Sequence, residues 1–75
     1  MSGEQRPTVR MNNYFQGRGE MERLGYFEQD HGSWAPYRWT IAYTVDGTTM
    51  GKASAARKED AKNEAARQLC QNMGI

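Results

Sequence analysis

Three basic side chains, Arg57, Lys58 and Lys62, crowd the first two turns of a helix predicted over Ala55–Met73. The N-terminus of a helix carries partial positive charge, so cations are unfavourable there, and two lysines four residues apart repel each other. The arrangement becomes favourable when an external anion is present, because free backbone N–H groups and ammonium groups then share one target. The pattern leaves two interpretations open. The residues form either an anion-binding site or a solvated charged face whose positive charge is partly offset by the two acids that follow Lys58.

Three neutral amides near the N-terminus are the second candidate for polar chemistry. Asn12, Asn13 and Gln16 share one side of a short helix predicted over Thr8–Gly17, and the opposite side is apolar. Amides both donate and accept hydrogen bonds, so they suit hydroxyls and base edges. Side chains that merely tolerate solvent would give the same pattern, and both interpretations stay open.

The sequence contains no recognisable set of catalytic or metal-binding residues. No group of His, Cys, Asp and Glu has metal-ligand spacing, and no nucleophile has a recognisable base. We therefore expect a protein that is not an enzyme, with no metal, cofactor or small-molecule substrate. The single cysteine, Cys70, lies on the apolar side of its helix and is interpreted as a core residue rather than a reactive thiol.

Length, charge and hydropathy set the class of protein. The 75 residues, 37% of them hydrophobic, suit one small domain. We expect a disordered tail over residues 1–6 and a domain over residues 7–75. The net charge is only +1, so anion binding must depend on where charges cluster. With no apolar run long enough to cross a membrane and no signal peptide, we expect an intracellular protein without a membrane partner.

Strand patterns fill the middle of the chain. Tyr37–Val45 alternates between apolar and polar residues, which is typical of a half-buried strand. The Asp46–Gly47 pair that follows is the strongest short hairpin signal, and Thr48–Ala53 is expected to pair back as an edge strand. A shorter strand is predicted over Tyr26–Gln29, and Asp30–Pro36 has the composition of a loop.

The C-terminal helix is expected to bury an apolar stripe, with Ser54 as its N-cap and Gly74 as its stop. The stripe consists of Ala61, Ala65, Leu69 and Met73. The predicted fold is thus α+β with the order α-β-β-β-α. Three antiparallel strands bury one face, so both helices should pack on that face, side by side. The other sheet face, which carries Arg38, Thr40 and Thr44, is expected to be wet.

This order resembles a double-stranded-RNA-binding domain. The matching motifs are MNNYFQ in the first helix, a glycine-containing loop, DG at the hairpin and RKEDAKNEAARQL in the last helix. The resemblance covers about Pro7 to Met73, and Ala61–Ala66 is its most specific part. It implies a module that spans about 16 base pairs of A-form RNA and contacts two minor grooves and the intervening phosphates with little sequence specificity.

The resemblance also implies which residues contact RNA. The first helix would enter one minor groove through Asn12, Asn13 and Gln16. The Gly32–Arg38 loop, with Ser33, Trp34 and Ala35, would enter the next minor groove. The start of the last helix would place Arg57, Lys58 and Lys62 on phosphates.

The chain departs from the family pattern at several of these positions. Glu59 stands where the family has the middle lysine of a basic triplet, and Asn13 stands where its first helix has a glutamate. The loop lacks the usual proline and histidine. Loss of a phosphate contact lowers affinity, and Arg57 or Lys52 could supply the missing charge.

Two functions therefore remain open. The first is binding to double-stranded RNA. The alternative is the same fold used for contact with a protein partner or a second copy. A domain used in that way would lose basic residues at the RNA-contact positions, as this chain has at Glu59. Trp34 is interpreted first as a loop anchor packed on the domain, and otherwise as a contact to a ribose or a protein.

Overall fold

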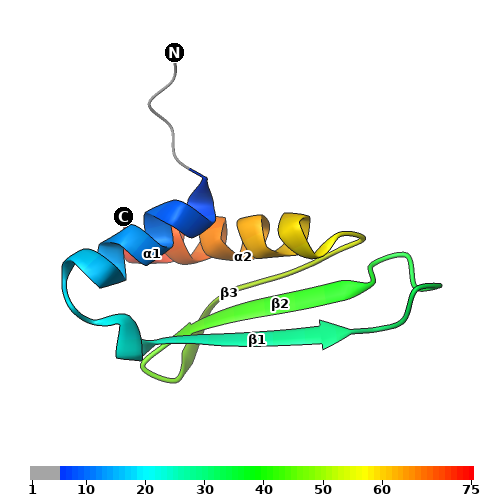
Figure 1. The fold of residues 1–75 in the computed structure, drawn as a ribbon, viewed down its shortest axis with the longest axis horizontal. Coiled ribbons are helices and arrows are strands. Elements are labelled where there is room, and N and C mark those ends of the chain that lie inside the picture. Colours follow the sequence, from blue (N-terminus) through cyan, green and yellow to red (C-terminus); the bar gives the residue numbers. More distant parts are fainter. Residues whose placement is uncertain (1–5) are drawn as a thin grey trace, which may run out of the picture.

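The structure, a computed structural model, describes residues 6–75 and has the expected α-β-β-β-α order (Figure 1). The elements are α1 (Pro7–Gly17), the short 3-10 helix η1 (Met21–Arg23), β1 (Leu24–Asp30), β2 (Trp39–Val45), β3 (Thr48–Ala55) and α2 (Lys58–Met73). The predicted α+β fold class is confirmed. Residues 1–5 of the predicted tail lie outside the described residues, and Arg6 leads directly into α1.

The strands form one antiparallel sheet in the order β1-β2-β3, so β3 is an edge strand as predicted. The Asp46–Gly47 turn joins β2 to β3, and its two residues have φ values of 52° and 85°, as a type I′ hairpin requires. The β2–β3 register shifts between Tyr43 and Thr44, which leaves Met50 as an extra residue in β3. Such a bulge locally increases the bend of its strand.

Both helices lie on one side of the sheet (Figure 1). α2 packs over β2 and β3, and α1 lies beside α2, where the Thr8 hydroxyl is 3.5 Å from Asn63 Oδ1. The predicted stripe of α2 is buried, together with Cys70, except that Met73 is partly exposed. The most deeply buried side chains are Met11, Phe15, Ile41, Ala61, Ala65, Ala66 and Leu69. The alanines let the α2 backbone approach β3 closely.

The two ends of α2 differ in how well the sequence predicted them. The helix begins at Lys58 rather than Ala55, and Ser54 is not its N-cap. Because β3 keeps pairing with β2 as far as Ala55, the chain cannot turn into a helix before Arg57, which takes the N-cap position without a side-chain hydrogen bond. Gly74, with φ 70°, ends α2 as predicted.

The sheet face away from the helices is not uniformly wet, and the prediction is wrong at Thr40, which is 7% exposed. The central strand places Thr40 between two neighbouring strands. Its hydroxyl lies 2.8 Å from His31 Nε2 and 2.7 Å from Ser54 Oγ. These side chains cover Thr40 from both sides and satisfy its hydroxyl.

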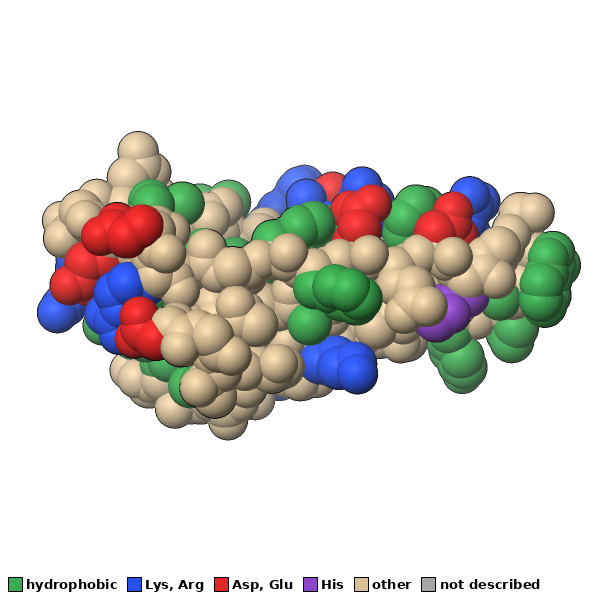
Figure 2. Space-filling view, turned by 90° about the horizontal axis from the view of Figure 1, so that it is seen from below, with side chains coloured by type: hydrophobic (Ala, Val, Ile, Leu, Met, Phe, Trp, Pro, Cys, Tyr) green, Lys and Arg blue, Asp and Glu red, His purple; other side chains and the backbone are tan. Residues whose placement is uncertain are grey.

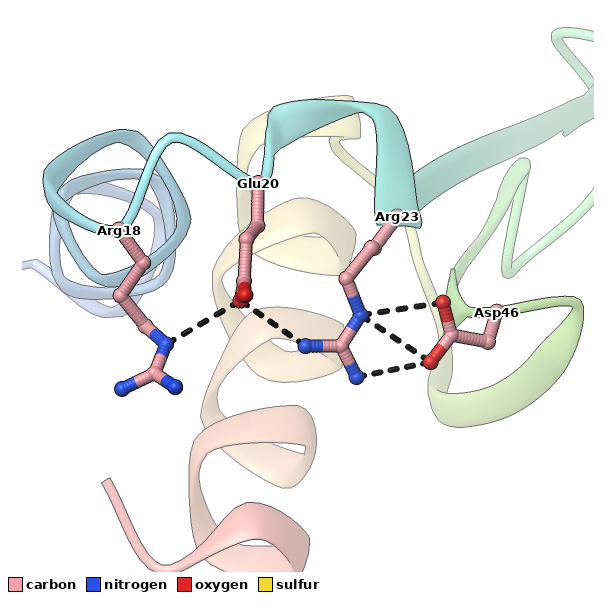
Figure 3. Close-up of polar contacts among 4 residues, drawn as sticks. All are labelled: Arg18, Glu20, Arg23 and Asp46. Atoms are coloured by element: carbon pink, nitrogen blue, oxygen red, sulfur yellow. Dashed lines mark hydrogen bonds and ion pairs between the residues drawn. The ribbon is translucent and has the colours of Figure 1, made fainter.

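A charged network ties the connection between α1 and β1 to the β2–β3 turn (Figure 3). Arg23 donates to both carboxylate oxygens of Asp46, with a shortest contact of 2.7 Å. Glu20 Oε1 accepts hydrogen bonds from Arg18 and Arg23 at 3.1 and 2.9 Å, which lower the pKa of that carboxyl group. Exposed ion pairs contribute little stability, about 1 kcal/mol at most for each pair.

Candidate nucleic-acid interface

An open groove of about 440 Å³, here called the helix–strand groove, lies where α1, α2 and β1 meet. Its lining residues are Asn12, Met21, Leu24, Tyr26, Glu28, Tyr43, Lys58 and Lys62. The groove is open because α2 covers β2 and β3 but leaves the greater part of β1 exposed. Three predicted contact residues, Asn12, Lys58 and Lys62, therefore share one surface although they come from opposite ends of the chain.

Lys58 is held by two contacts inside the protein. Its Nζ lies 2.9 Å from Glu28 Oε1 and 5.3 Å from the centre of the Trp39 ring. The Tyr26 hydroxyl donates to the same Glu28 oxygen at 2.6 Å. The hydrogen bond from Tyr26 lowers the pKa of Glu28 the most, and the hydrogen bond from Lys58 lowers it further. Glu28 is therefore a carboxylate at neutral pH, in the middle of the predicted anion site.

Sequence reasoning missed Glu28, although part of its signal was present. Tyr26 and Glu28 are two residues apart in a predicted strand, which places them on one sheet face. The β1–β2 register sets Glu28 opposite Ile41 and Tyr26 opposite Tyr43, so that face is the helix side. The proximity to Lys58 depends on how α2 crosses the sheet, and no local pattern encodes that crossing.

Lys62 is also close to an acid of the same chain, since its Nζ lies 3.8 Å from Glu59 Oε2. Both groove lysines therefore have carboxylate neighbours that compete with an external anion. Arg57 differs, because it is exposed and no carboxylate of residues 6–75 lies within 4.0 Å of its guanidinium. Arg57 is thus a predicted cation that remains available to a phosphate.

The amides of α1 are exposed, as predicted. Asn12 lines the helix–strand groove, whereas Asn13 and Gln16 do not. Within residues 6–75, no side-chain hydrogen bond occupies any of the three amides. Their donors and acceptors are therefore free for a ligand that lies along α1.

The loop between β1 and β2 lies at the opposite end of the sheet from α1, with the start of α2 between them (Figure 1). Trp34 is 85% exposed, so its interpretation as an anchor packed on the domain is wrong. The Ala35 N–H donates to the Gly32 carbonyl at 3.0 Å and closes a tight turn that keeps Trp34 away from the core. Ser33 is exposed beside Trp34, whereas Ala35 is half-buried and lines a separate groove on the outer sheet face.

Lys52 does not supply the charge that Glu59 removes. The register pairs Lys52 with Ala42, which places Lys52 on the sheet face opposite the helices. Lys58 and Lys62 lie on the helix side. Of the two substitutes that the sequence suggested, only Arg57 lies next to the groove lysines in the chain.

The base of the β1–β2 loop is closed by Asp30. Its carboxylate accepts hydrogen bonds from Arg38 at 2.8 and 2.9 Å and from the Gly32 N–H at 2.9 Å. The Arg38 contacts, and then the Gly32 contact, lower the pKa of Asp30 to about 2. Because the folded-state pKa is below the unfolded value of about 3.9, the closure is present above that value and is lost as pH falls towards 2.

We expect an NMR titration of the Asp30 carboxyl to have its midpoint near pH 2. In the Arg38→Met variant the midpoint should rise towards the ordinary value of about 3.9 without reaching it, because the Gly32 N–H remains as a donor. Equal midpoints in the two proteins would contradict the assigned role of Arg38.

The described residues also limit what else the surface can hold. Within residues 6–75, no cluster of three or more His, Cys, Asp or Glu side chains could bind a metal ion. In the same range, no helix has the length and apolar character needed to cross a membrane. Cys70 is buried, and burial raises the pKa of its thiol, as suits a core residue.

Comparison with known protein families places this geometry in context. The family model described as the double-stranded RNA binding motif matches residues 10–73, from the second turn of α1 to the end of α2. No curated protein matches the chain.

Proposed function

The chain belongs to the double-stranded RNA binding motif family, and from this premise we propose that it recognises A-form RNA by shape and backbone, without catalysis. The family is one of binding domains, and its ligand class is double-stranded RNA. The observation that carries the proposal is the helix–strand groove, in which Asn12 of α1 and Lys58 and Lys62 of α2 meet.

Each part of the proposed interface has its own role. Lys58, Lys62 and Arg57 contact phosphates of one groove. Asn12 and Asn13 hydrogen-bond to 2′-hydroxyls in the minor groove on one side, with Gln16 further along α1. Ser33, Trp34 and Ala35 belong to the loop that reaches the minor groove on the other side. Such contacts read the shape of the duplex and carry little sequence information.

The affinity should be modest, because Glu28 and Glu59 compete with phosphates for the groove lysines. The direct test is a titration with an RNA duplex of about 20 base pairs, slightly longer than the span of such domains. We expect a Kd near micromolar at low salt that weakens as salt rises. Absence of binding in that range would refute the proposal.

The α1 amides should distinguish RNA from DNA. We expect Asn12→Ala/Asn13→Ala to weaken binding to duplex RNA more than to duplex DNA, because DNA lacks the 2′-hydroxyl that these amides contact. Parallel titrations of the variant and the parent protein with both duplexes measure the difference. An equal loss for the two nucleic acids would remove Asn12 and Asn13 from the 2′-hydroxyl contacts.

Glu28 is expected to restrain RNA binding. Glu28→Gln keeps an acceptor for the Tyr26 hydroxyl but removes the charge that faces Lys58, so duplex RNA should bind about fivefold more tightly at low salt. Glu64→Gln is the matched control, because Glu64 also pairs with one cation, Arg67, and does not line the groove. If both variants bind like the parent, Glu28 does not face a phosphate.

Protein–protein contact is the second candidate function, and one observation favours it. Trp34 and Tyr37 are 85% and 67% exposed on one loop, and exposed aromatic residues are enriched in protein interfaces. Light scattering over a range of concentrations tests self-association. A mass that stays monomeric would count against a second copy as the partner.

A further inference from the structure

A second groove, of about 590 Å³, lies on the sheet face opposite the helices, and most of its lining plays no part in the proposed duplex interface. The groove, here called the outer groove, is lined by Gln29, Thr40, Lys52 and Ser54 of the sheet, by His31 and by residues 35–37 of the loop. It therefore requires its own explanation.

The strand register shapes this face. One row across the sheet contains Phe27, Ala42 and Lys52, and the next contains Gln29, Thr40 and Ser54. The central members, Ala42 and Thr40, are small and nearly fully buried, so β2 forms a low floor. The longer side chains of β1 and β3 stand on either side of it, about 10 Å apart at the backbone, because neighbouring strands are spaced by about 4.8 Å.

Two aromatic side chains are exposed around this floor. Phe27 is 52% exposed on the β1 side, and Tyr37 is 67% exposed where the loop closes the end of the groove. Figure 2 shows hydrophobic side chains in the middle of this face and again at the loop end, near the single histidine. The exposed rings of Phe27 and Tyr37 can therefore stack on planar groups of a ligand.

The charge of the face favours an anion. None of the outward positions paired across the three strands carries a carboxylate, and Lys52 has no carboxylate of residues 6–75 within 4.0 Å. In Figure 2 the acidic side chains lie at one end and along one rim, away from the middle of the face. A ligand with negative charge therefore meets Lys52 without a competing acid, in contrast to the helix–strand groove.

Polar groups complete the outer groove. His31, Thr40 and Ser54 form a chain of hydrogen bonds of 2.8 and 2.7 Å across the floor of the groove. The Gln29 amide forms no side-chain hydrogen bond within residues 6–75 and lines the groove. Gln29 and Ser54 can thus bond to base edges or to 2′-hydroxyls.

We propose that the outer sheet face binds single-stranded RNA, with bases stacked on Phe27 and Tyr37 and a phosphate on Lys52. Aromatic platforms combined with a cationic groove are the general means of binding unpaired strands. A duplex hides its base faces and needs several cations, whereas this face offers one cation and two rings. The site is separate from the helix–strand groove and overlaps the proposed duplex interface only at the β1–β2 loop, whose Ala35 lines it.

The test is an NMR titration of the domain with an oligouridine of about ten nucleotides, which cannot pair with itself and fits the site size of such modules. We expect saturable chemical-shift changes at Phe27, Thr40 and Lys52, and little chemical-shift change at Asn12 or Lys62. Phe27→Ala/Lys52→Gln should weaken oligouridine binding by at least about tenfold and leave duplex RNA binding unchanged. Both positions are exposed, so the variant should fold.

Other results would overturn the proposal. Shifts confined to the helix–strand groove would assign unpaired RNA to the duplex site, and tighter binding of oligothymidine would assign the face to DNA. Shifts at Phe27 and Lys52 that follow protein concentration without RNA would assign it to a second copy. Lys58→Ala/Lys62→Ala separates the two sites, because it should leave oligouridine binding intact even if duplex binding fails.

Discussion

Gly51→Ala is expected to destabilise the domain by about 3 kcal/mol or more, at the upper end of the usual cost of overpacking. A Cβ atom built on Gly51 would lie 1.9 Å from the carbonyl oxygen of Ala65 and 3.0 Å from the Leu69 nitrogen. Both are backbone atoms of α2, so no side-chain rotation can relieve the contact. The methyl group must push α2 away from the sheet, and the apolar stripe of α2, whose small alanines let the helix approach β3, would lose its packing.

Thermal unfolding measures this effect. For a domain of this size a loss of 3 kcal/mol lowers Tm by about 12–24 °C. Gly17→Ala is the matched control, because a Cβ on Gly17 meets nothing within 4 Å and the residue lies at the end of α1. We expect the control to melt at or slightly above the parent Tm, since alanine favours the helix. A Gly51 variant that melts with the parent would show that α2 does not approach β3 this closely.

Among the variants of the duplex interface, Lys58→Ala/Lys62→Ala should lose the most affinity for duplex RNA, up to about 60-fold at 0.1 M salt. Each phosphate contact contributes about 0.9 to the slope of log K against log salt, which corresponds to about eightfold per contact at that concentration. Removing Lys58 also leaves the Glu28 carboxylate unpaired in the groove, where it repels a phosphate. The slope itself should fall by about 1.8.

Titrations at several salt concentrations separate this effect from a change in net charge. Lys52→Ala/Arg67→Ala is the control, because it removes two cations that do not line the helix–strand groove. We expect that variant to keep nearly all duplex affinity and nearly the parent slope. If the two double variants lose affinity equally, the lysines act only through the overall field of the protein. If neither variant changes binding, the duplex site lies elsewhere.

Much of the fold could be predicted from local patterns. The alternation in β2, the Asp46–Gly47 turn, the alanine stripe of α2 and the glycine after it each follow from the chemistry of a few adjacent residues. Periodicity reports which face of an element is apolar, and an element with one apolar face must pack on another. For that reason the predicted order of the elements agrees with the structure, as does the predicted burial of Ala61, Ala65 and Leu69 in α2.

The end of β3 could not be predicted in the same way. Ala55, Ala56 and Arg57 favour helix, yet Ala55 pairs with Trp39 in the sheet, and Ser54 bonds to Thr40 instead of capping α2. Tertiary pairing overrides a helix preference of a few tenths of a kcal/mol per residue. The candidate site shows the same limit, because the sequence indicated Lys58 and Lys62 but not the carboxylate of Glu28 that holds Lys58.

The sequence by itself determined the fold, the duplex-binding family and the cations and amides that point to phosphates and hydroxyls. The tertiary structure decided which of these groups share a surface. Counting back from the Asp46–Gly47 turn without a bulge would place Lys52 opposite Ile41, on the helix face; the extra residue Met50 moves Lys52 to the outer face and brings Gly51 under α2. Side chains alternate with period two, so one inserted residue reverses every assignment beyond it, and only the paired strands reveal that insertion.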